Sequence, residues 1–305
     1  MRSRIILAGG SGFIGQALTN FLVANACDVA VLTRAPSHQA GPIRHVNWDG
    51  RKIDNWIENL DSAFAIVNLT GRSINCRHTA ANRREIVESR VDSVRVLGEA
   101  IAQCTQPPKV FVQAAGIGIY GDKGERWCDE NTGHGDDFVT EVCERWEAAF
   151  GNVDTRGARK VLLRLGVVLG PNGGFLGVLS RLTRAFLGGQ VGNGRQFISW
   201  IHIADLIQMF LAAIERDELA GVYNATSPNP VTNTEFMREL RRTLHRPWSP
   251  PVPKLAACVG SWLLGTQADL AFVSQRCTPK RFLESGFNFE FPELRPTLAN
   301  IYPNS

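Results

Sequence analysis

The chain has 305 residues, and its sequence predicts an α/β fold with a doubly wound parallel sheet and a smaller, mainly helical C-terminal lobe. Short, nearly continuous apolar runs alternate with amphipathic segments over the first two thirds of the chain, as a parallel sheet covered on both faces requires. After residue 228 this alternation stops and prolines punctuate helical segments. We therefore expect a sheet domain over 1–228, with 171–198 contributing to the second lobe, and a small C-terminal domain over 229–305.

The individual elements follow from hydrophobic periodicity. The apolar runs that predict strands lie at 5–8, 28–33, 63–69, 110–115, 161–169 and 221–225. Apolar residues recur every three or four positions over 13–24 and 79–103, which predicts two helices. The second helix carries its apolar side chains on one face (Ile86, Val87, Val91, Val94, Leu97 and Ile101). Residues 200–215 predict a short strand that leads into a further helix.

Composition excludes several classes of protein. Apolar residues make up 44% of the chain, and the net charge of +4 comes from scattered residues, with no basic stripe among aromatics that would indicate a nucleic-acid binder. Seven cysteines without a CxxC pair argue against a metal site and a disulfide framework. No signal peptide is visible, and the longest apolar stretch, 255–265, has about half the ~20 residues of a membrane span. We expect a cytoplasmic protein with reduced thiols, no metal and no membrane partner.

The most specific local pattern is GGSGFIG at 9–15, between the first predicted strand and the first predicted helix. Glycines at these spacings allow a tight turn, let the backbone approach a diphosphate, and let the helix pack against the strand. The helix N-terminus then offers free N–H groups to the phosphates. A P-loop is excluded because Gln16 stands where that motif has lysine. The pattern predicts a Rossmann-type dinucleotide site formed by Gly9, Ser11, Gly12, Phe13, Ile14 and Gly15, the alternative being a merely tight turn.

The second strand ends at Thr33 and Arg34. NAD sites place an acidic residue here to bind the ribose 2′-hydroxyl, whereas a cation suits the 2′-phosphate of NADP. We therefore predict NADP(H), with Arg34 on that phosphate and Thr33 donating a further hydrogen bond; the alternative is that Arg34 is a solvated loop residue. Leu69 and Thr70 stand at the end of the third predicted strand, and we expect their backbone to face the adenosine.

Together these features resemble the extended short-chain dehydrogenase/reductase superfamily, and most closely its atypical epimerase-like proteins of the YfcH and SDR39U1 type. Motifs that carry the resemblance run along almost the whole chain: GGSGFIG (9–15), LTR (32–34), VNLTG (67–71), SRV (89–91), GIYG (118–121), WEAA (146–149), LRLGVVLGPNGG (163–174), SWIHIADL (199–206), GVYNATSPNPVTNTEF (221–236) and GFNFEFPEL (286–294). The resemblance implies that NADP(H) binds in a crevice at the carboxyl ends of the parallel strands, with Glu85, Arg90 and Val168 beside it. The alternatives are an exposed helix cation for Arg90 and a core residue for Val168. Related folds dimerise through the helices over 80–103 and 137–150, so a homodimer is expected.

The chain lacks the acid/base residues of typical superfamily members. No Tyr-x-x-x-Lys occurs in the sequence, and counting back from Trp146 puts its two positions at Val139 and Cys143. The usual Ser or Thr position falls on Ala115 or Gly116. Other groups that could transfer a proton or orient substrate are Tyr120, Cys143, Glu141, Glu144, and His202 with Asp205; packing, solvation or backbone fixation is the alternative for each. Arg195, in a glycine-rich loop, could grip an anionic substrate or be part of an ordinary connector.

Two functional hypotheses remain open from the sequence. The first is an NADP(H)-binding, epimerase-like oxidoreductase that acts on a small-molecule substrate of unknown identity. The second is a non-catalytic protein that binds NADP(H) and senses it or regulates a partner. Both need the same cofactor site; the missing acid/base pair favours the second, whereas the second lobe, which could hold a substrate, favours the first.

Overall fold

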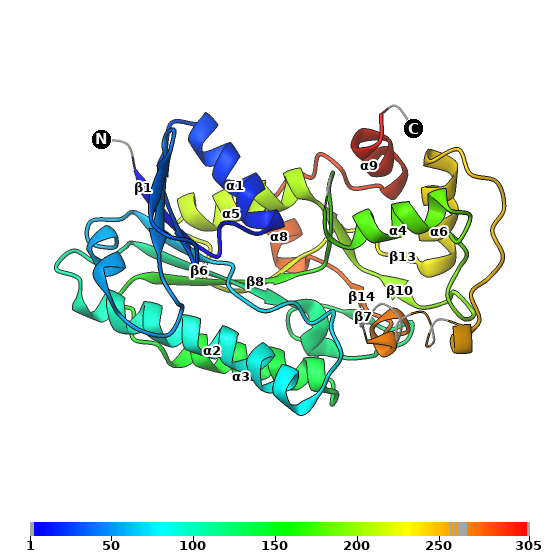
Figure 1. Ribbon diagram of the computed structural model, residues 1–305, viewed down its shortest axis with the longest axis horizontal. Helices are drawn as coiled ribbons and strands as arrows, with labels where there is room; N and C mark the ends of the chain where they lie inside the picture. The colour runs from blue at the N-terminus through cyan, green and yellow to red at the C-terminus, as the bar shows by residue number, and fades with distance from the viewer. Residues whose placement is uncertain (1–2, 172, 257, 259, 261–266, 304–305) are drawn as a thin grey trace.

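The computed structural model describes residues 3–171, 173–256, 258, 260 and 267–303. The sheet domain occupies one end of an elongated molecule, and α4 (Gly174–Arg184), α6 (Asn233–Thr243) and α9 (Leu294–Ile301) gather at the other (Figure 1). This arrangement confirms the predicted α/β class.

The main sheet has eight strands in the order β12-β8-β6-β5-β1-β2-β4-β3. Every neighbouring pair is parallel except β3 with β4. The strands are β1 (Arg4–Ala8), β2 (Asp28–Thr33), β3 (His38–Ala40), β4 (Ile43–Asn47), β5 (Ala65–Asn68), β6 (Val110–Gly116), β8 (Arg159–Leu165) and β12 (Gly221–Ala225). The chain winds outward from β1 in both directions, so the order reverses between β1 and β5, where such sheets bind ligands.

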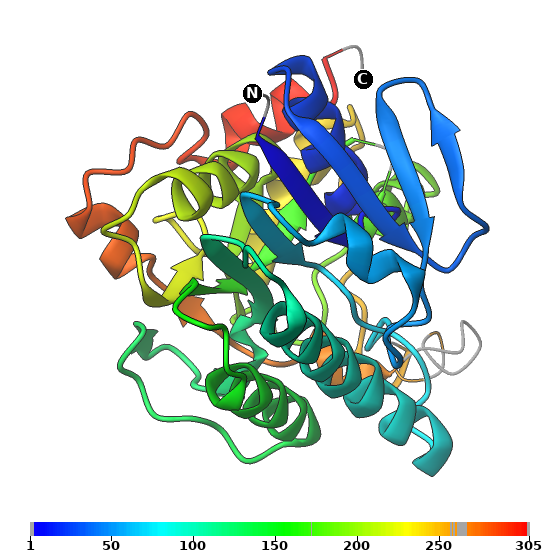
Figure 2. The same cartoon turned by 90° about the vertical axis from the view of Figure 1, so that its left-hand side faces the viewer.

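Helices cover both faces of this sheet (Figure 2). On one face, α1 (Phe13–Ala24) and α5 (Ile203–Glu215) pack in a core with Leu18, Leu22 and Phe210. On the other face, α2 (Ala80–Gln103) and α3 (Phe138–Asn152) contribute residues such as Leu97 and Phe150 to a second core. The bounds of α1 agree with the periodicity, and Thr79 caps α2 by accepting a hydrogen bond from the N–H of Asn82.

Two predictions about strands were wrong or incomplete. The run 161–169 is not one strand, because the chain leaves the sheet at Gly166 and continues as β9 (Val167–Leu169), which pairs with β11 (Trp200–His202). A side chain at Gly166 would lie 2.8 Å from the carbonyl oxygen of Ser199, so only glycine fits this crossing. The strands β3 and β4 were not predicted, because their exposed and half-buried residues form no apolar run.

The second lobe has its own small core, in which Leu176 of α4, Phe236 of α6 and Leu298 of α9 are buried together. Short strand pairs join it to other parts of the chain: β10 (Phe197–Ile198) with β13 (Val231–Thr232), and β7 (Trp127–Cys128) with β14 (Arg276–Cys277). Other short helices among the described residues are η1 (Asn55–Asn59), η2 (Ile117–Tyr120), η3 (Ala268–Ala271) and α8 (Lys280–Glu284). The segment 171–198 contributes α4 to this lobe.

The cysteines of this chain are thiols rather than disulfides. All seven are free, and four of them, Cys104, Cys128, Cys143 and Cys277, are buried. Within the described ranges, no helix has the length and apolarity needed to cross a membrane. Most of the apolar stretch 255–265 lies outside the described residues.

Candidate functional site

The glycine turn between β1 and α1 is closely packed backbone. Gly9 has φ +76°, and a Cβ there would lie 3.0 Å from the backbone nitrogen of Thr70. A Cβ at Gly15 would lie 2.5 Å from the Cα of Gly10, so helix and turn touch backbone to backbone. Gly12 caps α1 without a side-chain hydrogen bond. The turn therefore leaves the helix N-terminus open, as a diphosphate site requires.

The cation at the end of β2 has a fixed backbone and a free side chain. The amide of Asn47 donates hydrogen bonds to the carbonyl oxygens of Arg34 (3.2 Å) and Ala35 (3.0 Å). The guanidinium of Arg34 is exposed and makes no hydrogen bond or ion pair with any described residue. Thr33 is buried, and its hydroxyl accepts from the N–H of Ala35 at 3.4 Å. Arg34 is thus held ready for an anion without a protein carboxylate to neutralise it.

A buried amide network fixes the end of β5. The side-chain amide of Asn68 donates to the hydroxyl of Ser93 (3.1 Å) and to the carbonyl of Gln113 (3.0 Å). Its oxygen accepts from the N–H of Thr70 at 3.0 Å. The hydroxyl of Thr70 is buried and has no partner among the described residues, although buried polar groups are normally paired. An unpaired hydroxyl beside the glycine turn fits a site that a polar ligand completes.

Arg90 lies below the same loop and is buried, so the alternative of an exposed helix cation is wrong. Its guanidinium donates to the carbonyl oxygens of Arg72 and Ile86, both at 2.9 Å, and lies 4.9 Å from the ring centroid of Trp146. Burial lowers the pKa of Arg90 to about 10. No carboxylate of a described residue pairs with it, whereas Glu85 is exposed and forms an ion pair with Arg72.

The opposite wall of the site comes from the segment after β9. Phe13, the first residue of α1, lies against two glycines of this segment: added Cβ atoms at Gly170 and Gly173 would meet its ring at 2.9 and 2.6 Å. Val168 is half-buried in β9, opposite Ile201 in register. Ser11 is exposed at the turn, and Ile14 packs half-buried against the sheet core. The glycine turn, the β5 loop and β9 are therefore linked by direct packing.

The acid/base positions inferred by counting lie together, on the face of α3 that packs against η2. A Cβ at Gly118 would be 2.6 Å from Val139, and one at Gly116 would be 3.7 Å from the sulfur of Cys143. Cys143 is buried, and burial together with the nearby Glu147 carboxylate raises its pKa to about 12. The side chains at the counted positions are thus a valine, a protonated thiol and, at 115 or 116, an alanine or a glycine.

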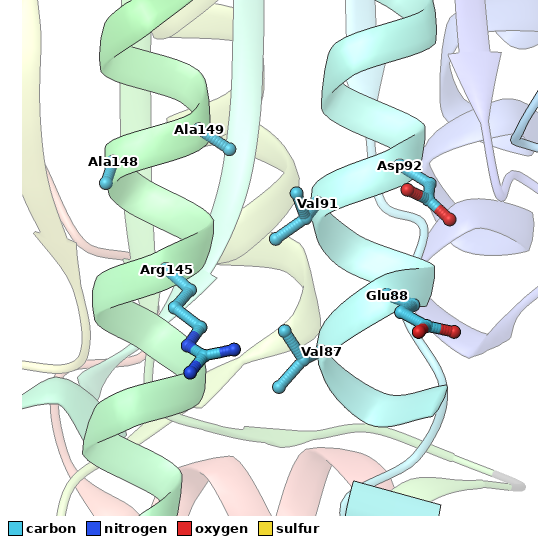
Figure 3. A pocket seen from close by; sticks show the side chains of 7 residues that line it. All are labelled: Val87, Glu88, Val91, Asp92, Arg145, Ala148 and Ala149. Carbon is cyan, nitrogen blue, oxygen red and sulfur yellow. The ribbon is translucent and has the colours of Figure 1, made fainter. Parts of the chain in front are cut away.

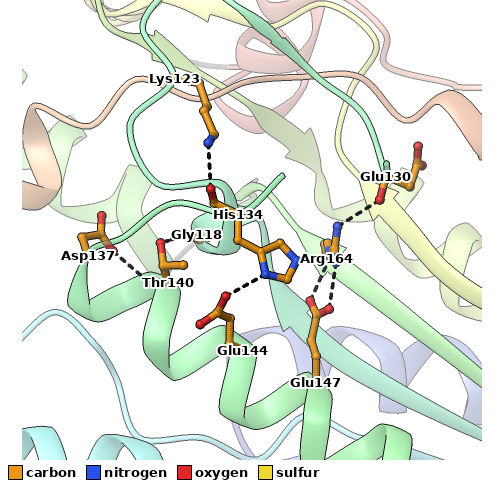
Figure 4. A network of polar contacts seen from close by, with 9 residues as sticks. All are labelled: Gly118, Lys123, Glu130, His134, Asp137, Thr140, Glu144, Glu147 and Arg164. Atoms are coloured by element: carbon orange, nitrogen blue, oxygen red, sulfur yellow. Dashed lines mark hydrogen bonds and ion pairs between the residues drawn. The ribbon is translucent and has the colours of Figure 1, made fainter. Parts of the chain in front are cut away.

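Tyr120 belongs to a buried polar network rather than to an open surface. Its hydroxyl donates to the side chain of Asn224 at 2.7 Å and accepts from Arg164 at 2.9 Å. Arg164 in turn binds Glu147 of α3 through two hydrogen bonds of 2.8 Å, as Figure 4 shows. Burial raises the pKa of Tyr120 well above its usual range, despite the nearby arginine. These contacts favour the packing role for Tyr120.

Glu141 and Glu144, unlike the third glutamate of α3, are exposed to solvent. Glu141 pairs with Arg145 at 2.7 Å, and Glu144 binds Nδ1 of His134 at 2.8 Å (Figure 4).

Arg195 is exposed, and its side chain makes no hydrogen bond or ion pair within the described part of the chain. Gly192 and Gly194 before it have φ near +61° and +70°, which glycine tolerates best. Arg195 thus stays available to an anion.

His202 and Asp205 fix backbone at the start of α5. Nδ1 of His202 accepts from the N–H of Ala204 at 3.2 Å, and the ring lies 4.0 Å from that of Phe291. The Asp205 carboxylate accepts from the N–H groups of Glu290 (2.8 Å) and Phe291 (3.0 Å). The C-terminal segment is thereby tied to the sheet domain, which supports the structural alternative for this pair.

The buried imidazole of His202 is expected to make the stability of the fold depend on pH. Burial lowers the pKa of His202 to about 4, from its usual value of 6.5. Between these two pH values the imidazole is protonated in the unfolded chain but neutral in the folded chain. Stability is therefore complete above pH ~6.5 and falls as the pH approaches 4, by up to about 3 kcal/mol from this group. In urea unfolding across this range, His202→Asn, which keeps a capping acceptor, should remove that slope. His245→Asn, on an exposed turn, should leave it; an unchanged slope in His202→Asn would contradict the assignment.

A shallow groove of about 370 Å³ runs between α2 and α3 (Figure 3). Its floor is apolar and its rim charged, and it is lined by Val87, Glu88, Val91, Asp92, Arg145, Ala148 and Ala149. The side chains of Val87 and Val91 point toward α3 and are only half-buried, although the periodicity assigned them to the core face. These are the helices expected to form a dimer interface, and that dimer stays a prediction.

Comparison with known proteins agrees with this geometry. Residues 5–226 match the family described as NAD dependent epimerase/dehydratase family, and residues 252–301 match a domain of unknown function, DUF1731. The chain is 36% identical to the epimerase family protein SDR39U1 of Bos taurus, with 98% of this chain and 99% of that protein covered. It is 34% identical to the epimerase family protein YfhF of Bacillus subtilis, with 97% of each covered.

Among solved structures, the human epimerase family protein SDR39U1 (isoform 2), crystallised with NADPH, superposes with a TM-score of 0.88. The two chains are 33% identical, and the match covers 99% of this chain and all of the human one. The resemblance stated from sequence motifs is confirmed over the full length: this chain belongs to the NAD dependent epimerase/dehydratase family and, within it, groups with the SDR39U1-like epimerase family proteins.

Proposed function

We propose that this protein binds NADP(H) and acts as an epimerase-like oxidoreductase on a small molecule of unknown identity. The observation that carries the cofactor assignment is Arg34, an exposed cation without a protein partner among the described residues, on a backbone fixed at the end of β2. A carboxylate there would select the ribose 2′-hydroxyl of NAD, whereas a guanidinium binds a phosphate through two hydrogen bonds. Human SDR39U1, which was crystallised with NADPH, supports the same choice.

Different residues around the glycine turn would bind different parts of the dinucleotide. The open N-terminus of α1, with Ser11 and Gly12, would bind the diphosphate, and Thr33 and Arg34 would bind the 2′-phosphate. Leu69 and Thr70 would line the adenosine side. Arg90, a buried cation without a carboxylate partner among the described residues, would add positive charge, and Val168 would pack beside the nicotinamide. When bound, the reduced nicotinamide supplies the hydride for oxidoreduction.

The substituted acid/base positions favour a second candidate function, a non-catalytic NADP(H) sensor. Of the counted positions, Val139 and either Ala115 or Gly116 cannot transfer protons, and the buried thiol of Cys143 stays protonated at neutral pH. Loss of a general acid or base costs on the order of 10²–10⁴-fold in rate unless another group serves. Screening bound NADPH for oxidation by carbonyl compounds and nucleotide sugars separates the two functions, because an enzyme turns over with one of them and a sensor with none.

Cofactor choice is tested by reversing the charge at the end of β2. Arg34→Glu should weaken NADPH binding at least tenfold and leave NADH binding within about twofold, because only the 2′-phosphate meets this side chain. Binding is measured by the change in nicotinamide fluorescence. Arg295→Glu makes the same charge change at an exposed position of α9 and should alter neither affinity. Equal losses for both dinucleotides in Arg34→Glu would contradict the assignment.

A further inference from the structure

The outer end of the second lobe exposes large apolar side chains. Phe186 and Leu187, just after α4, are 52% and 58% exposed, and Trp248 and Leu255 are 73% and 78% exposed. We call these four residues the outer patch. Single exposed apolar residues are ordinary, but a cluster of this size on a protein surface marks a site of interaction.

The two segments that carry the outer patch lie side by side although they are distant in the sequence. The guanidinium of Arg246 lies 5.3 Å from the ring centroid of Phe186. Beyond that contact the two segments run alongside each other: the N–H of Val252 donates to the carbonyl of Gln190 at 2.8 Å, and the N–H of Gly192 donates back to Val252 at 2.9 Å. In Figure 1 the 246–254 segment forms the right-hand edge of the molecule, far from the sheet domain.

The two sequence segments that supply the outer patch carry charge of one sign, although Glu239, one residue before the second segment, pairs with Arg242 at 2.9 Å. The stretches 171–199 and 240–268 contain no aspartate or glutamate. They contain seven cations: Arg181, Arg184, Arg195, Arg241, Arg242, Arg246 and Lys254. The whole chain has a net charge of +4, so the rest of it carries three more acidic than basic residues. The positive charge of this protein is therefore concentrated in the two segments that supply the patch.

We propose that the outer patch docks on the surface of a bilayer that contains anionic phospholipids. Phe, Leu and Trp side chains partition into the headgroup boundary, and Lys and Arg around them are attracted to the negative surface. A polyanion such as nucleic acid would bind the cations but would leave the four apolar side chains without a partner, whereas an anionic lipid surface can bind both. The proposed contact is peripheral: the outer patch lies on the membrane surface, and only single side chains enter the headgroup region.

The test is co-sedimentation of the full-length protein with vesicles of phosphatidylcholine and phosphatidylglycerol in equal parts, compared with vesicles of phosphatidylcholine alone. We expect binding to the anionic vesicles that weakens as salt is added. Leu187→Ser with Trp248→Ser, and separately Arg181→Glu with Lys254→Glu, should each weaken it at least tenfold. All four side chains are exposed or half-exposed, so these variants should fold.

Matched controls keep the result specific. Trp127→Ser removes another exposed tryptophan, packed under Arg276 away from the patch, and Lys52→Glu with Arg84→Glu reverses two cations of the sheet domain. Neither should change vesicle binding. The proposal is overturned if anionic vesicles do not bind, if the patch variants bind like the wild type, or if the controls lose as much. It is also overturned if the wild type self-associates in sedimentation velocity and Leu187→Ser with Trp248→Ser abolishes that association, because the patch is then an interface between copies.

Discussion

Glu147→Ala is expected to lower the free energy of unfolding by about 3–5 kcal/mol, because it leaves the buried charge of Arg164 without its partner. The side chains of Glu147 and Arg164 are only 14% and 5% exposed, and they form two hydrogen bonds of 2.8 Å. Arg164 also holds Tyr120, which in turn binds Asn224 of β12. The ion pair therefore joins α3, β8, η2 and β12. Urea denaturation followed by circular dichroism measures the effect.

Glu141→Ala is the matched control for this change. Glu141 lies on the same helix and pairs with Arg145, but both side chains are at least half exposed. Removing such a surface pair should cost less than about 1 kcal/mol. Similar losses in the two variants would mean that the buried pair contributes no more than an exposed one, and the network would lose its assigned role.

Gly15→Ala should weaken NADPH binding at least a hundredfold while the protein stays folded. The added Cβ would lie 2.5 Å from the Cα of Gly10 and 2.6 Å from its carbonyl carbon, and backbone cannot move aside as a flexible side chain can. The turn must therefore open, and its N–H groups lose the positions that a diphosphate needs. Nicotinamide fluorescence measures the affinity, and circular dichroism verifies the fold.

Gly151→Ala provides the comparison for Gly15→Ala. Gly151 is in the last turn of α3, and no atom lies within 4 Å of an added Cβ. Alanine favours helix over glycine by about 1 kcal/mol, so this variant should be as stable as the wild type or more so and bind NADPH normally. Unchanged affinity in Gly15→Ala would show that the closeness of turn and helix is not needed for binding.

Features that depend on local sequence could be predicted here. The runs at 28–33 and 13–24 gave β2 and α1 with their observed bounds, because apolar periodicity and glycine spacing act within one element. The break at Gly166 could not be predicted in this way. It depends on Ser199, more than thirty residues later, whose carbonyl oxygen excludes any side chain at that position.

The same distinction applies to the candidate site. The glycine turn and Arg34 could be predicted, because the strand, the turn and the helix that define them follow one another in the sequence. The Asn68–Gln113 amide pair and the Arg164–Glu147 ion pair were missed, because the first joins neighbouring strands and the second joins a strand to a helix packed on the sheet. Three polar residues near apolar neighbours in strands, Asn68, Gln113 and Arg164, were the signal available for them. The burial of Arg90 was likewise invisible, since a helix cation is usually exposed.

The turn at 9–15 and the guanidinium of Arg34 are together assigned to a dinucleotide that carries a 2′-phosphate. Calorimetric titration of the purified wild-type protein with NADPH and with NADH tests this assignment. We predict saturable binding of NADPH, at least tenfold tighter than that of NADH. Equal affinities would contradict the role of Arg34, and no heat with either dinucleotide would contradict the cofactor site as a whole.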